Sequence, residues 1–150
     1  MPSATAARLQ ADVIAAMKAK DKERLGVLRQ MQAAIKQVAI DTRTEPDEDG
    51  VIKIVMAYAK KVRDSLDAAE KAGREDLAAE ARQELALVQV YLPAALSDDE
   101  LGAIVDEVVA ETGATSPKDM GTVIKGVMAR VKGGAEGSRV SAMVKQKLVG

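Results

Sequence analysis

The chain has 150 residues, of which 47% are hydrophobic, and a formal net charge of −1, so it is long enough to bury a core and too apolar to be disordered. It contains no cysteine and no histidine, which excludes disulfides, thiolate metal sites, a cysteine nucleophile and the commonest general base. Tyr58 and Tyr91 are its only aromatic residues. Small aliphatic side chains must therefore fill the core, which favours closely packed helices.

The chain shows no apolar run near the roughly 20 residues that cross a bilayer. Its first residues also lack the apolar segment of a signal peptide. We therefore expect a cytoplasmic protein that makes no membrane contact.

The net charge conceals a division along the chain. Residues 1–93 hold 15 basic and 15 acidic side chains, whereas residues 94–117 hold six acidic side chains and no basic one. Residues 118–150 hold seven basic and two acidic side chains. Such sorting indicates either an anionic partner or mutual neutralisation of the two segments within the fold.

Helical periodicity predicts four helices in the first part of the chain. The first begins after Ser3 or Thr5, Asp21 is a typical N-cap for the second, Gly73 ends the third, and "YLP" at 91–93 ends the fourth. Their apolar stripes are Leu9, Val13 and Met17; Leu25, Leu28, Ile35 and Val38; Val51, Val55, Tyr58, Val62, Leu66 and Ala69; and Leu77, Ala81, Leu85 and Val88.

Three shorter helices are predicted after Pro93. Ser97 and Glu100 form a capping box for the first of them, which Gly113 closes. The next has an N-cap and a first-turn proline at 116–117 and ends at 133–134. The last begins near 137–138 and carries Val140, Val144 and Leu148.

These patterns predict an all-α, multihelical fold, since no window alternates apolar and polar residues over the length of a strand. We expect an N-terminal four-helix subdomain over residues 1–93 and a C-terminal three-helix subdomain over residues 94–150.

The penultimate predicted helix carries Lys118, Lys125 and Lys132 at intervals of seven residues. On a continuous helix they would lie opposite the apolar face, about 10 Å apart. They are either a solvated face or a surface for a phosphate backbone. Gly121 and Gly126 each cost the helix about 0.5–1 kcal/mol relative to alanine, which the close approach of a helix or of a polynucleotide would offset.

The turn "KGGAEGS" at 132–138 allows two interpretations. It lacks the order of residues of a nucleotide-binding P-loop. It either ends one helix and starts the next, or presents backbone N–H groups, with Ser138 and Arg139, to a phosphate at the start of the last helix. The sequence does not decide between them.

Three separated signatures resemble the GatB/YqeY domain family, and more closely its free-standing YqeY-type members. They are "AGREDL" at 72–77, "YLP" at 91–93 and "DMGTVIKGVM…KGGAEGSRV" from residue 119 onward, and the resemblance covers essentially the whole chain. It implies a helical fold of four plus three helices. In larger relatives the module is the C-terminal tail of the B subunit of a glutamine-dependent aspartyl/glutamyl-tRNA amidotransferase, where it helps to hold tRNA.

The resemblance implies that the C-terminal helices contact nucleic acid. The predicted positive surface consists of Lys118, Lys125, Arg130, Lys132, Arg139 and Lys145. Glycines that match the family pattern, and that would allow close approach, are Gly121, Gly126, Gly133 and Gly137.

The residues argue against catalysis by this chain alone, and we predict no catalytic residue, metal site or cofactor. Cysteine and histidine are absent, and the serines are scattered. The acidic runs at 74–77 and 97–100 suit helix N-termini, where carboxylates complement the helix dipole. Arg74 either holds the corner between the third and fourth helices or lies at an interface, and we favour the first.

Three hypotheses for function follow. The chain binds folded RNA such as tRNA through phosphates, since single-stranded RNA is commonly held by aromatic stacking. Alternatively it is a protein-interaction adaptor, with amidotransferase subunits or a tRNA-handling protein as partners. The third hypothesis makes it part of a glutamine-dependent carbon–nitrogen ligase assembly.

Overall fold

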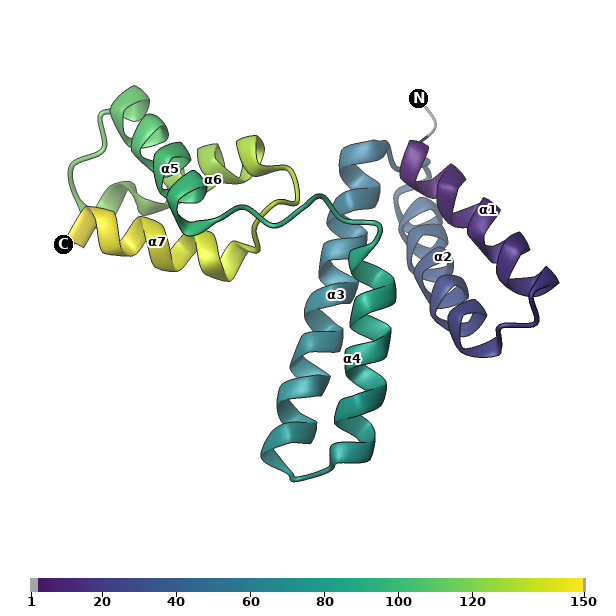
Figure 1. Cartoon of the computed structure of the whole chain (residues 1–150). Coiled ribbons are helices and arrows are strands. Elements are labelled where there is room, and N and C mark those ends of the chain that lie inside the picture. Colours follow the sequence, from purple (N-terminus) through teal and green to yellow (C-terminus); the bar gives the residue numbers. More distant parts are fainter. Residues whose placement is uncertain (1–2, 150) are drawn as a thin grey trace. The chain divides into compact units, whose positions relative to one another are not determined.

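The structure, a computed structural model that describes residues 3–149, is all-α, as predicted. Seven α-helices and one short 3-10 helix, η1, follow one another, and the described residues contain no strand (Figure 1). The helices are α1 (Ala4–Lys18), α2 (Lys22–Thr42), α3 (Glu48–Lys71), α4 (Glu75–Gln89), α5 (Asp98–Thr112), α6 (Met120–Val131) and α7 (Gly137–Val149), and η1 (Pro117–Asp119) precedes α6.

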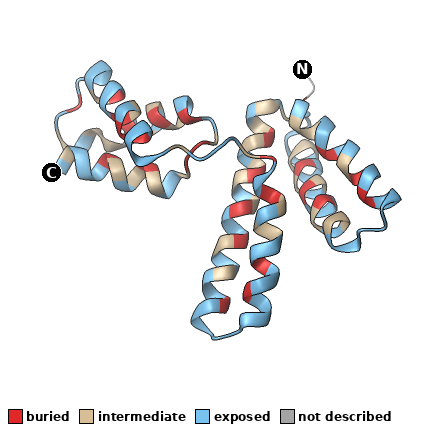
Figure 2. Cartoon of the chain, in the orientation of Figure 1, coloured by how far each residue is buried: buried red, intermediate tan, exposed pale blue. Residues whose placement is uncertain are grey.

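The contacts divide the chain into two compact units, Met1–Leu92 and Pro93–Gly150. The first contains α1 to α4, and the second contains α5 to α7. Each unit has its own set of buried positions (Figure 2), which are occupied mostly by aliphatic residues. That the two parts fold as separate subdomains stays a prediction.

Short polar side chains begin three helices of the first unit, because each accepts a backbone N–H that lacks a partner within the helix. The hydroxyl of Ser3 accepts from the N–H of Ala6 at 3.1 Å. Asp21 caps α2 in the same way at 3.2 Å, as predicted, and Asp47 caps α3 at 2.8 Å. The third helix therefore starts three residues before the first apolar residue of its predicted stripe.

The first unit is built from two helical hairpins, α1 with α2 and α3 with α4 (Figure 1). Helix α1 also packs on α3, and α2 also packs on both α3 and α4, so each hairpin covers the apolar face of the other. The buried residues of this core are Leu9, Val13, Ala16, Leu28, Met31, Ile35, Val51, Val55, Ala59, Val88 and Tyr91.

The prediction of a core-facing position is wrong for two residues of the apolar stripes, since Met17 is 51% exposed and Leu77 is 43% exposed. Met17 lies in the last turn of α1 and Leu77 in the first turn of α4. A periodic stripe thus extends slightly beyond the length over which the helices pack. Met31, which the predicted stripe omitted, is 1% exposed and belongs to the core.

Glu48 joins the N-termini of α1 and α3. Its carboxylate accepts hydrogen bonds from the hydroxyl of Ser3 at 2.6 Å and from the hydroxyl of Thr5 at 2.9 Å. The backbone N–H of Thr5 also donates to it at 3.1 Å. The hydrogen bond from Ser3, followed by those from Thr5, lowers the pKa of Glu48 from its ordinary value although partial burial opposes this.

The hydroxyl groups of both tyrosines donate hydrogen bonds to carboxylates of the first unit. Tyr58 of α3 donates to Glu84 of α4, and Tyr91 donates to Asp12 of α1. The guanidinium of Arg8 lies 5.0 Å from the centre of the Tyr91 ring. Burial first, and then the carboxylate, raises the pKa of Tyr91 to about 12, and the same causes raise the pKa of Tyr58.

The second unit packs α5, α6 and α7 against one another around a core of leucine, valine and alanine. Its first helix starts with the predicted capping box between Ser97 and Glu100. The N–H of Leu96 donates to the carbonyl oxygen of Gly134 at 2.8 Å, which joins the entry of the unit to the turn before α7.

Candidate nucleic-acid interface

Helix α6 is shorter than predicted, and only one of the three evenly spaced lysines lies within it. Lys118 belongs to η1, and Lys132 follows the helix as its C-cap with a left-handed φ of 43°. Pro117 fixes φ at the start of η1, and Gly133 continues the left-handed turn with φ of 92°. The lysines therefore mark the start, the middle and the end of α6 instead of standing along one regular helical stripe.

The interior face of α6 is apolar. Val123, Val127 and Val131 are buried in the core of the second unit. Lys125 is exposed and lies on the opposite side of the helix from these valines. Gly121 is also exposed on this side, so little side-chain bulk surrounds Lys125 there.

The six predicted basic residues fall into two groups. Four lysines are exposed and form no ion pair with any described residue: Lys118, Lys125, Lys132 and Lys145. The two arginines are held by acidic side chains of α5. Arg130 contacts Glu107 at 3.3 Å and also pairs with Glu111, and Arg139 contacts Asp98 at 2.7 Å.

Lys147 makes the third link to α5, with its ammonium 2.8 Å from Asp106. These pairs neutralise part of the acidic segment inside the unit, as the competing sequence hypothesis expected. Each pair joins α5 to α6 or α7 across 19 to 41 residues of sequence. Because the pairs are exposed, each contributes at most about 1 kcal/mol to stability.

The predicted close-approach glycines differ in what surrounds them. A Cβ atom on Gly126 would lie 2.8 Å from Cγ1 of Val108, so this glycine lets α5 and α6 pack closely. Gly121 and Gly137 have open space at the Cβ position, and Gly133 serves the turn through its positive φ. Gly134 was not among the predicted close-approach glycines, yet a Cβ atom on it would lie 3.0 Å from Cγ of Leu96.

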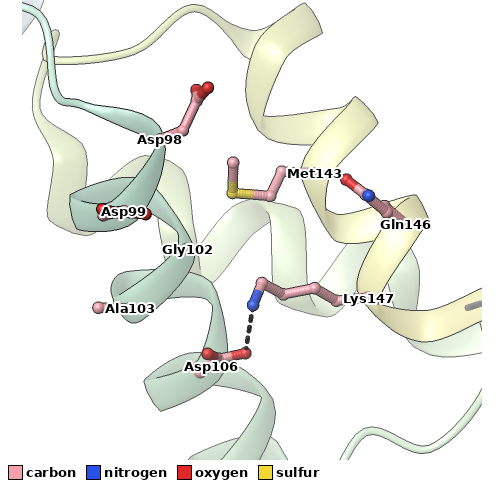
Figure 3. Close-up of a pocket in the computed structure, with 8 residues that line it drawn as sticks. All are labelled: Asp98, Asp99, Gly102, Ala103, Asp106, Met143, Gln146 and Lys147. Atoms are coloured by element: carbon pink, nitrogen blue, oxygen red, sulfur yellow. Dashed lines mark hydrogen bonds and ion pairs between the residues drawn. The ribbon is translucent and has the colours of Figure 1, made fainter.

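An open pocket lies between α5 and α7 (Figure 3). Asp98, Asp99 and Asp106 line its α5 side, and Met143 and Lys147 line its α7 side. The close-up shows the ammonium of Lys147 turned to Asp106. With three carboxylates and one ammonium the pocket is negative, so it does not suit a phosphate group.

Four of the six serines of the chain have local structural roles. Ser3 and Ser97 cap helices, and Ser65 donates to the carbonyl of Lys61 one turn earlier. Ser116 precedes η1, where its N–H donates to Asp119. In residues 3–149 no group of three or more acidic side chains is placed to hold a metal ion.

The acidic runs and Arg74 have local roles. Glu75 and Asp76 lie in the first turn of α4, and Asp98 to Glu100 lie in the first turn of α5, as predicted. Arg74 forms a two-pronged ion pair with Asp76, at 3.1 and 3.2 Å, at the corner between α3 and α4. This hydrogen bond lowers the pKa of Asp76.

Within the part of the chain that the structure describes, no helix combines the length and the apolar character needed to cross a bilayer. The cytoplasmic location expected from the sequence is a separate matter and stays a prediction.

Two curated proteins resemble the chain, and both are named "Altered inheritance of mitochondria protein 41, mitochondrial". The one from Eremothecium gossypii is 34% identical over 112 residues, which make up 73% of this chain and 61% of that protein. The one from Vanderwaltozyma polyspora is 38% identical over 85 residues, or 56% of this chain and 46% of that protein. The chain thus matches less than two thirds of the length of either relative.

A comparison with protein families covers almost the whole chain. The family described as "Yqey-like protein" matches residues 6–148, and this range includes every helix from α2 to α6 and nearly all of α1 and α7. The chain therefore belongs to the family of YqeY-like proteins.

Proposed function

We propose that the chain binds folded RNA, with tRNA as the first candidate, through phosphate contacts of its C-terminal unit. One observation carries the proposal: after α5 has engaged Arg130, Arg139 and Lys147, four exposed lysines remain without an acidic partner among residues 3–149. They are Lys118, Lys125, Lys132 and Lys145. Arg130 and Arg139 keep N–H donors that their carboxylates do not use, and they would add secondary contacts.

The kind of RNA follows from the side chains that the unit offers. Residues 94–150 contain no aromatic side chain on which an unpaired base could stack. Ammonium groups recognise phosphates without reading the base sequence. The proposed ligand is therefore an RNA with a fixed shape, bound with little sequence preference.

The proposal gives the chain no catalytic step of its own. Without cysteine or histidine it lacks the usual nucleophile and base for releasing ammonia from glutamine. Its proposed role is that of an accessory protein to tRNA-dependent amidation, which holds the RNA while another subunit carries out the chemistry. The names of the two relatives make a mitochondrial setting as good a candidate as the cytoplasm.

A protein-interaction adaptor is the second candidate. The ion pairs between α5 and the two following helices favour it, because they remove three of the seven cations of residues 118–150 from the surface. This candidate predicts a protein partner, including amidotransferase subunits of a carbon–nitrogen ligase assembly, that stays bound after treatment with ribonuclease. The RNA proposal predicts that such a partner is lost.

Binding of an unmodified tRNA transcript to the full chain tests the proposal, with fluorescence anisotropy as the measurement. The variant Lys125→Glu/Lys132→Glu reverses two of the free charges. The matched control is Lys53→Glu/Lys61→Glu, which makes the same change in charge at two exposed, unpaired lysines of α3. The proposal expects weaker binding in the first variant than in the control, and equal affinities would contradict it.

A further inference from the structure

Helix α2 carries a second row of basic side chains, in the first unit. Lys22, Arg29 and Lys36 all lie within the helix at intervals of seven residues, and Arg43 follows as its C-cap after a further seven. All four are exposed, and none forms an ion pair with any residue of the described range 3–149. We call these four residues the α2 basic row.

The row is more regular than the lysines around α6. Seven residues turn a helix by about 700°, so successive members are offset by only about 20° and stand about 10 Å apart along the axis. Lys22, Arg29 and Lys36 keep this geometry because all three are inside one helix. At α6, by contrast, two of the three lysines lie beyond the helix ends.

Two of the three positions between the basic residues carry small side chains or none, and Ile40 occupies the third. Gly26 and Ala33 are exposed and lie on the same side of α2 as the row. A Cβ atom on Gly26 would meet nothing within 4 Å. The two acidic residues of the helix, Glu23 and Asp41, project about 100° away from the row, so no carboxylate of α2 shields it.

The opposite face of α2 fixes the direction of the row. Leu28, Met31 and Ile35 are buried in the core of the first unit, so the helix cannot rotate to hide its basic side. Residues 22–43 hold five basic and two acidic side chains, a net charge of +3, although residues 1–92 hold equal numbers of basic and acidic side chains. A straight, positive and low surface of this kind fits a linear array of phosphates.

We infer that the α2 basic row is a second contact surface for the phosphate backbone of a folded or double-stranded RNA. The inference deepens the proposed function, because it assigns the first unit a part in holding the same class of ligand. A bilayer fits less well: helices that lie in a membrane surface insert bulky apolar side chains, and the apolar face of α2 is used by the core. Ile40 is the one large apolar residue beside the row.

The test uses the full chain with two RNA probes, a tRNA transcript and a blunt RNA duplex of about two helical turns. Arg29→Glu/Lys36→Glu is compared with the control Lys53→Glu/Lys61→Glu, and Arg29→Lys/Lys36→Arg keeps the charge in the row. Circular dichroism verifies that each variant keeps the helical content of the wild type. We expect the reversal to weaken RNA binding on the order of 10- to 100-fold at about 0.1 M salt. The slope of log affinity against log salt should become shallower by about 2, because two phosphate contacts are lost. The charge-preserving variant should bind like the wild type.

The variant Lys125→Glu/Lys132→Glu separates this inference from the proposed function. If that variant loses affinity while the α2 reversal binds like its control, the α2 inference is overturned and the C-terminal site stands. If only the α2 reversal loses affinity, the inference stands and the C-terminal proposal fails. Unchanged binding in both, or no binding by the wild type at low salt, overturns both. Vesicles with phosphatidylserine provide the last arm: binding to them that requires the row, without an effect on RNA, assigns α2 to a membrane surface and overturns the inference.

Discussion

Gly126 of α6 lies so close to Val108 of α5 that a Cβ atom on the glycine would stand 2.8 Å from Cγ1 of the valine. Val108 is 2% exposed, and its β-branched side chain has one strongly preferred rotamer in a helix. The two backbones therefore approach as closely as they do because one of the facing residues has no side chain. This contact identifies Gly126 as a packing residue of the second unit.

Gly126→Ala should accordingly destabilise the second unit. Overpacking typically costs about 1–3 kcal/mol, and the better helix propensity of alanine returns only about 0.5–1 kcal/mol. Gly121→Ala, in the same helix with open space around the position, should leave stability unchanged or raise it by up to about 1 kcal/mol. Urea unfolding followed by circular dichroism measures both. Equal stability of the two variants would refute the packing role.

Gly121→Ala also tests the exposed side of α6. A phosphate backbone that comes close to this glycine would meet the added methyl group, so tRNA affinity should fall although the protein is at least as stable as before. The measurement is a tRNA titration beside the unfolding curve. An unchanged affinity would show that the RNA does not approach the helix at this position.

Glu48 should make the first unit sensitive to acid. The hydrogen bonds from Ser3 and Thr5 lower the pKa of Glu48 in the folded chain below its ordinary value of 4.5. Their contribution is therefore complete above about pH 4.5 and is lost as the pH falls through the folded pKa. Glu48→Gln should cost about 1 kcal/mol at neutral pH, a modest amount because the carboxylate is only partly buried.

The control for this variant is Asp49→Asn, which removes a charge from the same first turn of α3. It should shift stability less than Glu48→Gln and leave the acid limb of the stability curve in place. Identical acid profiles for Glu48→Gln and the wild type would mean that another carboxylate causes the acid sensitivity.

Alkaline titration should find both tyrosines resistant to ionisation. Burial and the nearby carboxylates raise the pKa of Tyr91 to about 12 and raise that of Tyr58 as well. A folded pKa above the unfolded one contributes stability that is complete below about pH 10 and is lost as the pH rises through the folded value. Absorbance of the phenolate, followed in Tyr58→Phe and Tyr91→Phe, assigns each transition. Ionisation of either folded tyrosine near pH 10 would contradict the hydrogen bonds to Glu84 and Asp12.

Arg130 and Lys125 should respond differently to loss of charge. Arg130→Gln removes two ion pairs with α5, so it should lower the free energy of unfolding by up to about 2 kcal/mol at low salt and by less at high salt. Lys125→Gln removes a charge that has no partner among the described residues, so it should leave stability unchanged and weaken tRNA binding more. A larger loss of affinity in Arg130→Gln would reverse the division between the two groups of cations.

Local signals allowed most of the fold to be predicted. Asp21 and the pair Ser97 and Glu100 fix helix starts through contacts within three residues, and the sequence contains all the information that such contacts need. The apolar period was equally informative in the middle of each helix and failed near the ends, at Met17 and Leu77. There, burial depends on where the neighbouring helix stops.

The site was less predictable because its determinants are not local. The sequence shows that Gly121 and Gly126 interrupt a helix, but only the fold shows that Val108 faces one of them. The pairing of Arg139 with Asp98 joins residues 41 positions apart, so a list of basic residues could not separate free cations from engaged ones. The α2 basic row was hidden by counting charge over residues 1–93, where acidic side chains on other faces balance it.

The salt dependence of tRNA binding tests the central claim most directly. Contacts from the four free lysines of the C-terminal unit should give log affinity a slope of about −3 to −4 against log salt, and contacts from α2 would make it steeper. In Lys125→Glu/Lys132→Glu the slope should become shallower by about 2, whereas Lys53→Glu/Lys61→Glu should leave it unchanged. A slope near zero in the wild type, or the same slope in all three proteins, would contradict binding of RNA through these lysines.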